Sequence, residues 1–169
     1  MSMTAAERQQ RVDQYERGPR RLHDALHLVP DPAVKWRPSP GKWSVHEVVC
    51  HCADSEMNGA MRLRYVLAEK DPVIMGYDQD AWARLFDYHS RPLEPALSVV
   101  EAVRAHTTAL LRTLPDDAWS RLGRHSDSGP YSVETWLRIY SDHLEGHARQ
   151  IERNLDVWRA GVPPESAGR

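Results

Sequence analysis

The sequence contains few cysteines, only Cys50 and Cys52 among 169 residues. Side chains two positions apart on a helix point to nearly opposite sides, so these thiols can neither form an unstrained disulfide with each other nor share a metal ion. A chain of this length buries an adequate core without disulfides. We therefore expect one domain over residues 1–169, with an ordered core from about residue 5 to 160 and a loose tail at 161–169.

Long apolar runs and an excess of basic charge are also absent. No stretch approaches the length needed to cross a membrane, and the first residues lack the hydrophobic region of a secretory signal. Lysine and arginine number 22 against 24 acidic residues, which gives a formal net charge of −2 and no electrostatic footprint for nucleic acid. We expect a cytoplasmic protein that engages neither nucleic acid nor a membrane.

Apolar residues recur at three- and four-residue intervals over four long segments, which is the spacing of amphipathic helices. Thr4 with Glu7 and Ser44 with Glu47 form capping-box patterns, and Ser132 is a good N-cap. These signals predict four helices, over about residues 4–29, 44–69, 95–114 and 132–158.

Gly18-Pro19 interrupts the first predicted helix, because a proline inside a helix removes one backbone hydrogen bond. Either the helix kinks there, or a new segment starts with Pro19 in its first turn. Residues 77–86 are compatible with one or two helical turns, and the polar stretch 120–131 is interpreted as a connection. Since no segment shows a strand-like alternation and no repeat occurs, the sequence predicts an all-α four-helix bundle.

Two of the nine histidines, His143 and His147, are four residues apart in the last predicted helix, where this spacing stacks two side chains on one face. A metal ion is one partner that could serve both imidazoles. A third ligand must then come from a facing helix, and His51 flanks the apolar stripe of the second helix. The spacing alone leaves open a pair of core-edge histidines bonded to other side chains. His23 and His27 form a second such pair, which a solvated helix flank explains.

The sequence also resembles a known family. WSVHEVVCHCAD, at residues 43–54, resembles the second helix of the DinB-like (YfiT-like) four-helix metal-binding family, and DHLEGHARQI, at residues 142–151, resembles its fourth-helix signature. GYDQDAWA and GPRRLHDAL are similar to two further segments, so the resemblance extends from about residue 10 to 158. It implies a four-helix bundle of the DinB/YfiT-like type that is usually a homodimer.

Carried over residue by residue, the resemblance implies that His51, His143 and His147 hold a divalent metal ion. Zinc and nickel are the expected metals, with iron as a third choice, because imidazole nitrogen does not select strongly among them. The same resemblance ranks this set above His23 and His27.

The family includes bacillithiol- and mycothiol-dependent transferases. Our first expectation is therefore a metal-dependent transferase, which moves a low-molecular-weight thiol of the bacillithiol, mycothiol or glutathione type onto a small-molecule electrophile. One alternative is a metal-dependent hydrolase, in which activated water attacks a carbonyl carbon. Another is a metal-binding stress or sensor module without catalysis, because a fold does not fix a function.

Five further residues are candidates for the surroundings of the metal. Asp54 and Glu47 flank His51 on the second helix and are candidates for a proton shuttle or for an acceptor of a ligand N–H. Asp78 and Trp82, in the YDQDAW segment, and Tyr140, in the last helix, are expected to line the substrate pocket.

Overall fold

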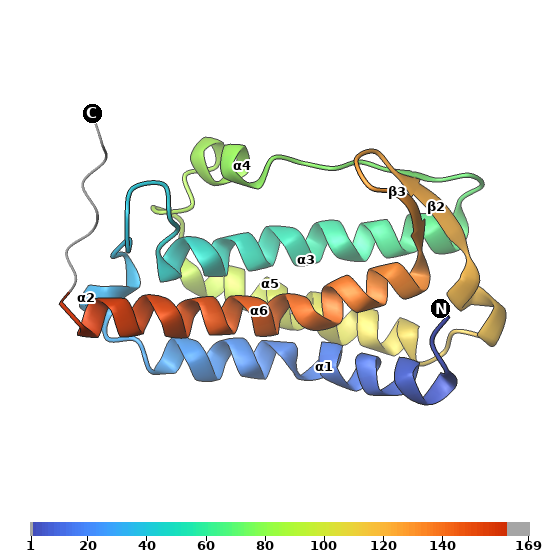
Figure 1. The fold of residues 1–169 in the computed structure, drawn as a ribbon, viewed down its shortest axis with the longest axis horizontal. Helices are drawn as coiled ribbons and strands as arrows, with labels where there is room; N and C mark the ends of the chain where they lie inside the picture. Colours follow the sequence, from blue (N-terminus) through green and yellow to red (C-terminus); the bar gives the residue numbers. More distant parts are fainter. Residues whose placement is uncertain (1, 162–169) are drawn as a thin grey trace.

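Four long helices form a bundle in the computed structural model of the chain, which describes residues 2–161 (Figure 1). They are α1 (Ala5–His27), α3 (Val45–Ala68), α5 (Leu93–Leu111) and α6 (Val133–Arg159). α1 packs against α5 and α6, and α3 packs against the same two helices. In Figure 1, α1 and α6 run in one direction while α3 and α5 run in the other. The predicted four-helix bundle is confirmed.

Three of the four helices begin where the capping signals predicted. Thr4 and Ser44 each accept a hydrogen bond from the backbone of a glutamate three residues later, and each glutamate side chain accepts one in return. Ser132 caps α6 through the backbone N–H of Thr135. The exception is α5, which begins at Leu93 instead of residue 95, because Pro92 and not Pro95 precedes its first turn.

α1 continues through Pro19 as one helix, and a neighbouring helix compensates the lost hydrogen bond. Pro19 has no N–H to donate to the carbonyl four residues earlier, which is that of Tyr15. Instead, Nη1 of Arg104 in α5 donates to this carbonyl at 2.6 Å. A Cβ on Gly18 would lie 2.7 Å from the same Nη1. Gly18 and Pro19 thus form a notch in α1, the Gly18-Pro19 notch, in which Arg104 docks.

Shorter elements connect the long helices. α2 (Asp31–Val34) follows α1, whereas β1 (Val73–Ile74) and α4 (Gln79–Leu85) lie between α3 and α5. The 3₁₀ helix η1 (Asp116–Ser120) and strands β2 (Leu122–His125) and β3 (Gly129–Ser132) lie between α5 and α6. α4 confirms the helical turns expected within residues 77–86, and it covers the N-terminal part of α3 (Figure 1).

The three strands form a small sheet that the sequence did not predict. β1 pairs in parallel with β2, and β2 pairs antiparallel with β3. No strand exceeds four residues, and glycine, proline, arginine and histidine in β2 and β3 give them little strand propensity. Tertiary packing holds them instead, since Ile74 and Tyr131 are buried in the same apolar cluster as Trp136. The interpretation of residues 120–131 as a plain connection was therefore wrong.

None of the helices within residues 2–161 has both the length and the apolar character that a membrane crossing requires. Of the tail that we expected to be loose, Gly161 adopts a turn with φ +66°. Residues 162–169 lie outside the described residues.

Gly59 of α3 faces the ring of Tyr140 in α6, and a Cβ at this position would lie 2.3 Å from Tyr140 Cε1. We expect Gly59→Ala to lower the free energy of unfolding by about 1–3 kcal/mol, because the buried ring would have to move. Gly146→Ala is the control, since a Cβ at Gly146 in α6 would meet nothing within 4 Å. Its better helix propensity should raise stability by up to about 1 kcal/mol. Urea unfolding of both metal-free variants measures the difference, and equal stabilities would contradict the tight packing at Gly59.

Candidate metal centre

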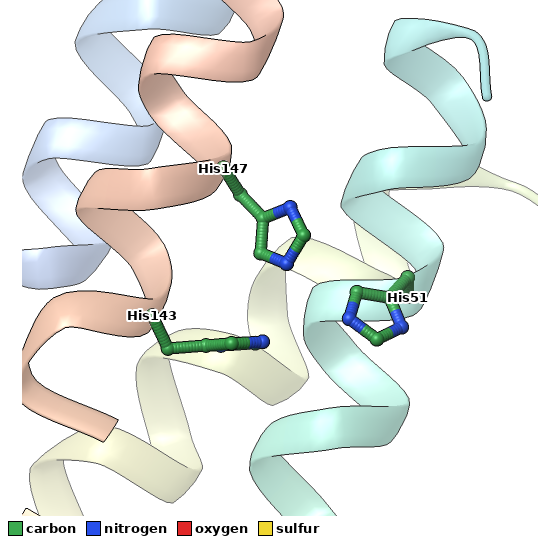
Figure 2. Close-up of side chains that lie close together, drawn as sticks. All are labelled: His51, His143 and His147. Atoms are coloured by element: carbon green, nitrogen blue, oxygen red, sulfur yellow. The ribbon is translucent and has the colours of Figure 1, made fainter. Parts of the chain in front are cut away.

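Three imidazoles converge between α3 and α6. His51 lies in the second turn of α3, and His143 and His147 lie on successive turns of α6. One ring nitrogen of each histidine is within 4.8 Å of the others, and these nitrogens face a common space (Figure 2). His51 is buried, and the other two are partly buried. The three residues are referred to below as the histidine triad.

Hydrogen bonds orient the two histidines of α6. His143 Nδ1 lies 3.3 Å from Oε1 of Glu56, and since an ionised carboxylate can only accept, the imidazole donates. His147 Nδ1 lies 2.9 Å from the side-chain oxygen of Gln150, to which it donates in the same way. In this tautomer Nε2 of each ring is an acceptor, and it faces the space inside the triad (Figure 2).

Burial keeps two of the three rings neutral. It lowers the pKa of His51 to about 2, helped by the nearby rings of His147 and His143. It also lowers the pKa of His147 to about 4, again with a contribution from His143. Around neutral pH these two side chains are unprotonated, which is the form that binds metals.

The donor set fits a divalent transition-metal ion. Imidazole nitrogens suit zinc, nickel and iron, and among residues 2–161 the group of possible ligands consists of these three histidines without a carboxylate. Three protein ligands leave a coordination position open, as in catalytic zinc sites, whereas structural sites are closed by a fourth. His51 Nδ1 is buried and forms no hydrogen bond within residues 2–161, and Trp43 packs against the His51 ring at a centroid distance of 4.7 Å with the rings tilted by 47°.

A fully buried ion pair lies behind His143. Arg104 is 1% exposed and Glu56 is 0% exposed, and the guanidinium donates to both carboxylate oxygens at 2.8 and 2.6 Å. Arg104 also donates to the backbone carbonyls of Tyr15 and Tyr140. Burial alone would raise the pKa of Glu56, but Arg104 and His143 hold it below its ordinary value. Glu56 is therefore an ionised acceptor that fixes the His143 ring.

The sequence alone did not point to this pair, although it contains a signal. Glu56 and Arg104 interrupt the apolar stripes of two predicted helices, and opposite charges in two such stripes are typical of a buried ion pair. Ser55 and Gln150 also contact the triad and were not predicted to do so. The Oγ of Ser55 lies 3.3 Å from His143 Nε2.

Glu47 and Asp54 have partners outside the triad. Glu47 forms its capping box and accepts hydrogen bonds from Arg37. Asp54 accepts a hydrogen bond of 2.6 Å from the Tyr88 hydroxyl. Neither contacts the free Nδ1 of His51 within the described part of the chain. The structure therefore corrects the expectation that Asp54 accepts a ligand N–H, and it gives Glu47 a structural role.

Helix geometry explains this outcome. At about 100° per residue, Glu47 and Asp54 lie roughly 40° and 60° round α3 from His51 in the same direction. Ser55 lies roughly 40° in the opposite direction, and it is the one that contacts His143 on α6. Only one flank of His51 faces the site, and periodicity could not tell which.

Of the three residues expected to line the substrate pocket, only Tyr140 has a ring contact with the triad among the described residues. The ring of Tyr140 lies 5.8 Å from that of His143, but it is 3% exposed and stacks on Trp136, so it forms a wall of the site within the core. Trp82 lines a surface hollow of about 220 Å³ next to α3. Asp78 accepts the Ala81 N–H and caps α4.

The second histidine pair, His23 and His27, lies outside the histidine triad. His23 Nε2 pairs with Glu101 on the surface at 2.8 Å. Neither His23 nor His27 belongs to the group of ligating atoms, which agrees with the solvated-flank interpretation.

Comparison with known sequences gives consistent relatives. A family model described as the DinB superfamily matches residues 14–151. A candidate metal-dependent hydrolase of Oceanobacillus iheyensis is 39% identical over 111 residues, which are 66% of this chain and 64% of that protein. YfiT of Bacillus subtilis, also named as a candidate metal-dependent hydrolase, is 30% identical over 91% of this chain and 89% of its own.

Two solved structures share the fold. That of Bacillus subtilis YfiT, described as a candidate metal-dependent hydrolase with an unusual four-helix bundle topology, has a TM-score of 0.86 and 29% identity, over 96% of this chain and 92% of that one. A mycothiol-dependent maleylpyruvate isomerase has a TM-score of 0.69 over 88% of this chain and 63% of its own. At 14% identity, this second likeness concerns the fold alone.

Proposed function

Because this chain belongs to the DinB superfamily, we propose that it is a metal-dependent hydrolase whose ion is held by His51, His143 and His147. The observation that carries the proposal is the convergence of three ring nitrogens within 4.8 Å. Two of the rings are held by hydrogen bonds from the nitrogen that faces away from the triad. Such second contacts orient a metal ligand before the ion binds.

The residues of the chain prepare the site for this chemistry. When bound, a divalent ion supplies Lewis acidity, which lowers the pKa of water and polarises a carbonyl group. Neutral imidazoles do not reduce the charge of the ion as carboxylate ligands would, and two rings of the triad are kept neutral by burial. Glu56 holds the His143 ring by accepting its Nδ1–H, and Gln150 does the same for His147.

The comparisons favour hydrolysis over the thiol transfer that we expected first. Relatives at 39% and 30% identity are named as candidate metal-dependent hydrolases. The thiol-dependent relative is similar in fold alone, so thiol transfer gains no specific support. The metal, the small-molecule substrate and the homodimer stay predictions.

The proposal is tested with zinc-loaded and chelator-treated protein, assayed on 4-nitrophenyl acetate and a 4-nitroanilide. We expect hydrolysis that chelation abolishes and added zinc or nickel restores, because the triad contains no other means of activating water. Parallel assays offer bacillithiol, mycothiol or glutathione together with 1-chloro-2,4-dinitrobenzene.

Zinc-dependent consumption of a thiol without any hydrolysis would favour the thiol transferase over the hydrolase. No metal-dependent turnover of either kind would contradict both and leave a metal-binding module without catalysis.

A further inference from the structure

Ser55 is one helical turn after His51 in α3, on the flank of the helix that faces α6. Its side chain reaches across the interface between the two helices, where its Oγ lies 3.3 Å from His143 Nε2. Ser141 of α6, by contrast, donates to a carbonyl of its own helix, that of Arg138. Since Ser55 is only 5% exposed, its hydroxyl is sheltered from water beside a metal-ligating nitrogen.

A chain of hydrogen bonds fixes which atom supplies the proton in this contact. Arg104 can only donate, and Glu56, whose pKa is held below its ordinary value, accepts from it at 2.6 Å. Glu56 also accepts at 3.3 Å from His143 Nδ1, which carries the single ring proton of a neutral imidazole. The other nitrogen, Nε2, is then an acceptor, so the hydrogen bond across the interface is donated by Ser55.

The Nε2 atom of His143 has one lone pair, and this nitrogen faces the space inside the triad (Figure 2). It cannot accept a hydrogen bond and bind a metal ion at the same time, so binding of the ion breaks the contact with Ser55. The hydroxyl has another acceptor within reach, because a serine inside a helix can turn to the carbonyl four residues earlier. For Ser55 this is the carbonyl of His51.

We propose that the Ser55 hydroxyl competes with the metal ion for the lone pair of His143 Nε2, and thereby lowers the affinity of the histidine triad for metal. The inference rests on the metal centre of the proposed function and not on its hydrolysis. Ser55 holds the His143 ring from the side of the triad, and Glu56 holds it from the other side. The ring is thus oriented before the ion binds, by a hydrogen bond that the ion has to displace.

The test compares Ser55→Ala with Ser141→Ala at about pH 8, where an ordinary imidazole is neutral. Ser141 is a matched control, because both serines are buried, at 5% and 1% exposure, and both substitutions remove one hydroxyl. Ser141 is two residues before His143, but its partners are Arg11 and Arg138, which are not part of the triad. Chelator competition measures the affinity of each protein for zinc and for nickel.

We expect Ser55→Ala to bind zinc more tightly than the wild type, on the order of 3- to 10-fold, because the ion no longer displaces a hydrogen bond. Nickel affinity should rise by the same factor, since the bond is lost from the metal-free protein alone. Ser141→Ala should keep both affinities of the wild type. Unchanged or weaker binding in Ser55→Ala, a rise for one metal alone, or an equal rise in Ser141→Ala would each overturn the inference.

A further variant, Ser55→Cys, tests the geometry independently of the strength of a hydrogen bond. Its thiol would lie at the lone pair of His143 Nε2, within reach of an ion bound there, and would ligate that ion as a thiolate. The cobalt-loaded, reduced variant should therefore show the near-ultraviolet charge-transfer absorption of a cobalt thiolate. The wild type is the control, because Cys50 and Cys52 lie outside the ligand group. The same near-ultraviolet absorption in both proteins would count against the placement of Ser55 and overturn the inference.

These measurements need no turnover, so the inference and the proposed function fail separately. Zinc-loaded protein that hydrolyses neither ester nor anilide would overturn the hydrolase, while a higher zinc affinity of Ser55→Ala would still support the competition. Hydrolysis together with equal zinc affinity in Ser55→Ala and the wild type would overturn the inference alone. A wild type and variants that bind no zinc would overturn both.

Discussion

Arg104→Met is expected to lower the free energy of unfolding of the metal-free protein by about 3–5 kcal/mol, the usual cost of leaving one charge of a buried pair without its partner. Without the guanidinium, the Glu56 carboxylate at 0% exposure would either stay charged and unpaired or take up a proton, and both cost stability. The backbone carbonyls of Tyr15 and Tyr140 would each lose a donor as well. Urea unfolding followed by circular dichroism measures the change.

Arg112→Met is the matched control, because it makes the same substitution at the C-terminal end of α5. Arg112 pairs with Asp13 and Glu16 at the surface, and its side chain is 38% exposed. Pairs of that kind contribute about 0–1 kcal/mol. Adding Glu56→Gln to Arg104→Met should recover part of the loss, because it removes the unpaired charge. If Arg104→Met and Arg112→Met unfold within 1 kcal/mol of each other, the buried pair does not carry the stability assigned to it.

The second large effect is expected for the affinity of the protein for zinc. We expect His51→Ala to weaken zinc binding on the order of 10²–10³-fold, because it removes the only ligand from α3 and leaves two on α6. Zinc sites with four ligands bind with about 10–16 kcal/mol, so one ligand is worth roughly 3–4 kcal/mol. Zinc affinity is measured by chelator competition, and metal content after purification by mass spectrometry.

His23→Ala is the control for this variant, since His23 belongs to the other histidine pair and its Nε2 lies 2.8 Å from Glu101 at the surface. It should keep the zinc affinity of the wild type. Full metal occupancy in His51→Ala, or loss of metal in His23→Ala, would remove the basis for the triad as a metal centre. His147→Ala should behave like His51→Ala.

The sequence predicted those parts of the fold that depend on local physics. Capping at Thr4, Ser44 and Ser132 depends on side chains within three residues, so the boundaries of three helices could be placed correctly. The sheet depends on pairing between segments that are far apart in the sequence, such as Val73 with Arg124. The local pattern of residues carries no information about such pairing, so the strands were not predicted. The same limit applied to Gly18-Pro19, where the partner of the freed carbonyl is on α5.

The same distinction between local and long-range information applies to the site. Spacing gave His143 and His147 as a pair but left a core-edge interpretation open, and only the family resemblance added His51. The flank of His51 that meets α6 could not be known without the orientation of α3 in the bundle. For that reason Asp54 and Glu47 were named as candidates, whereas Ser55 and Glu56, which contact His143, were not.

The position of Arg104 has a consequence for the order of folding. Its guanidinium joins α5 to Glu56 of α3, to the Tyr15 carbonyl of α1 and to the Tyr140 carbonyl of α6. These residues are far apart in the chain, so the three contacts close long loops and form together late. A bundle with one helix still undocked would leave His143 without a fixed Glu56. Uptake of the metal would then follow assembly, and its rate would report the final step of folding.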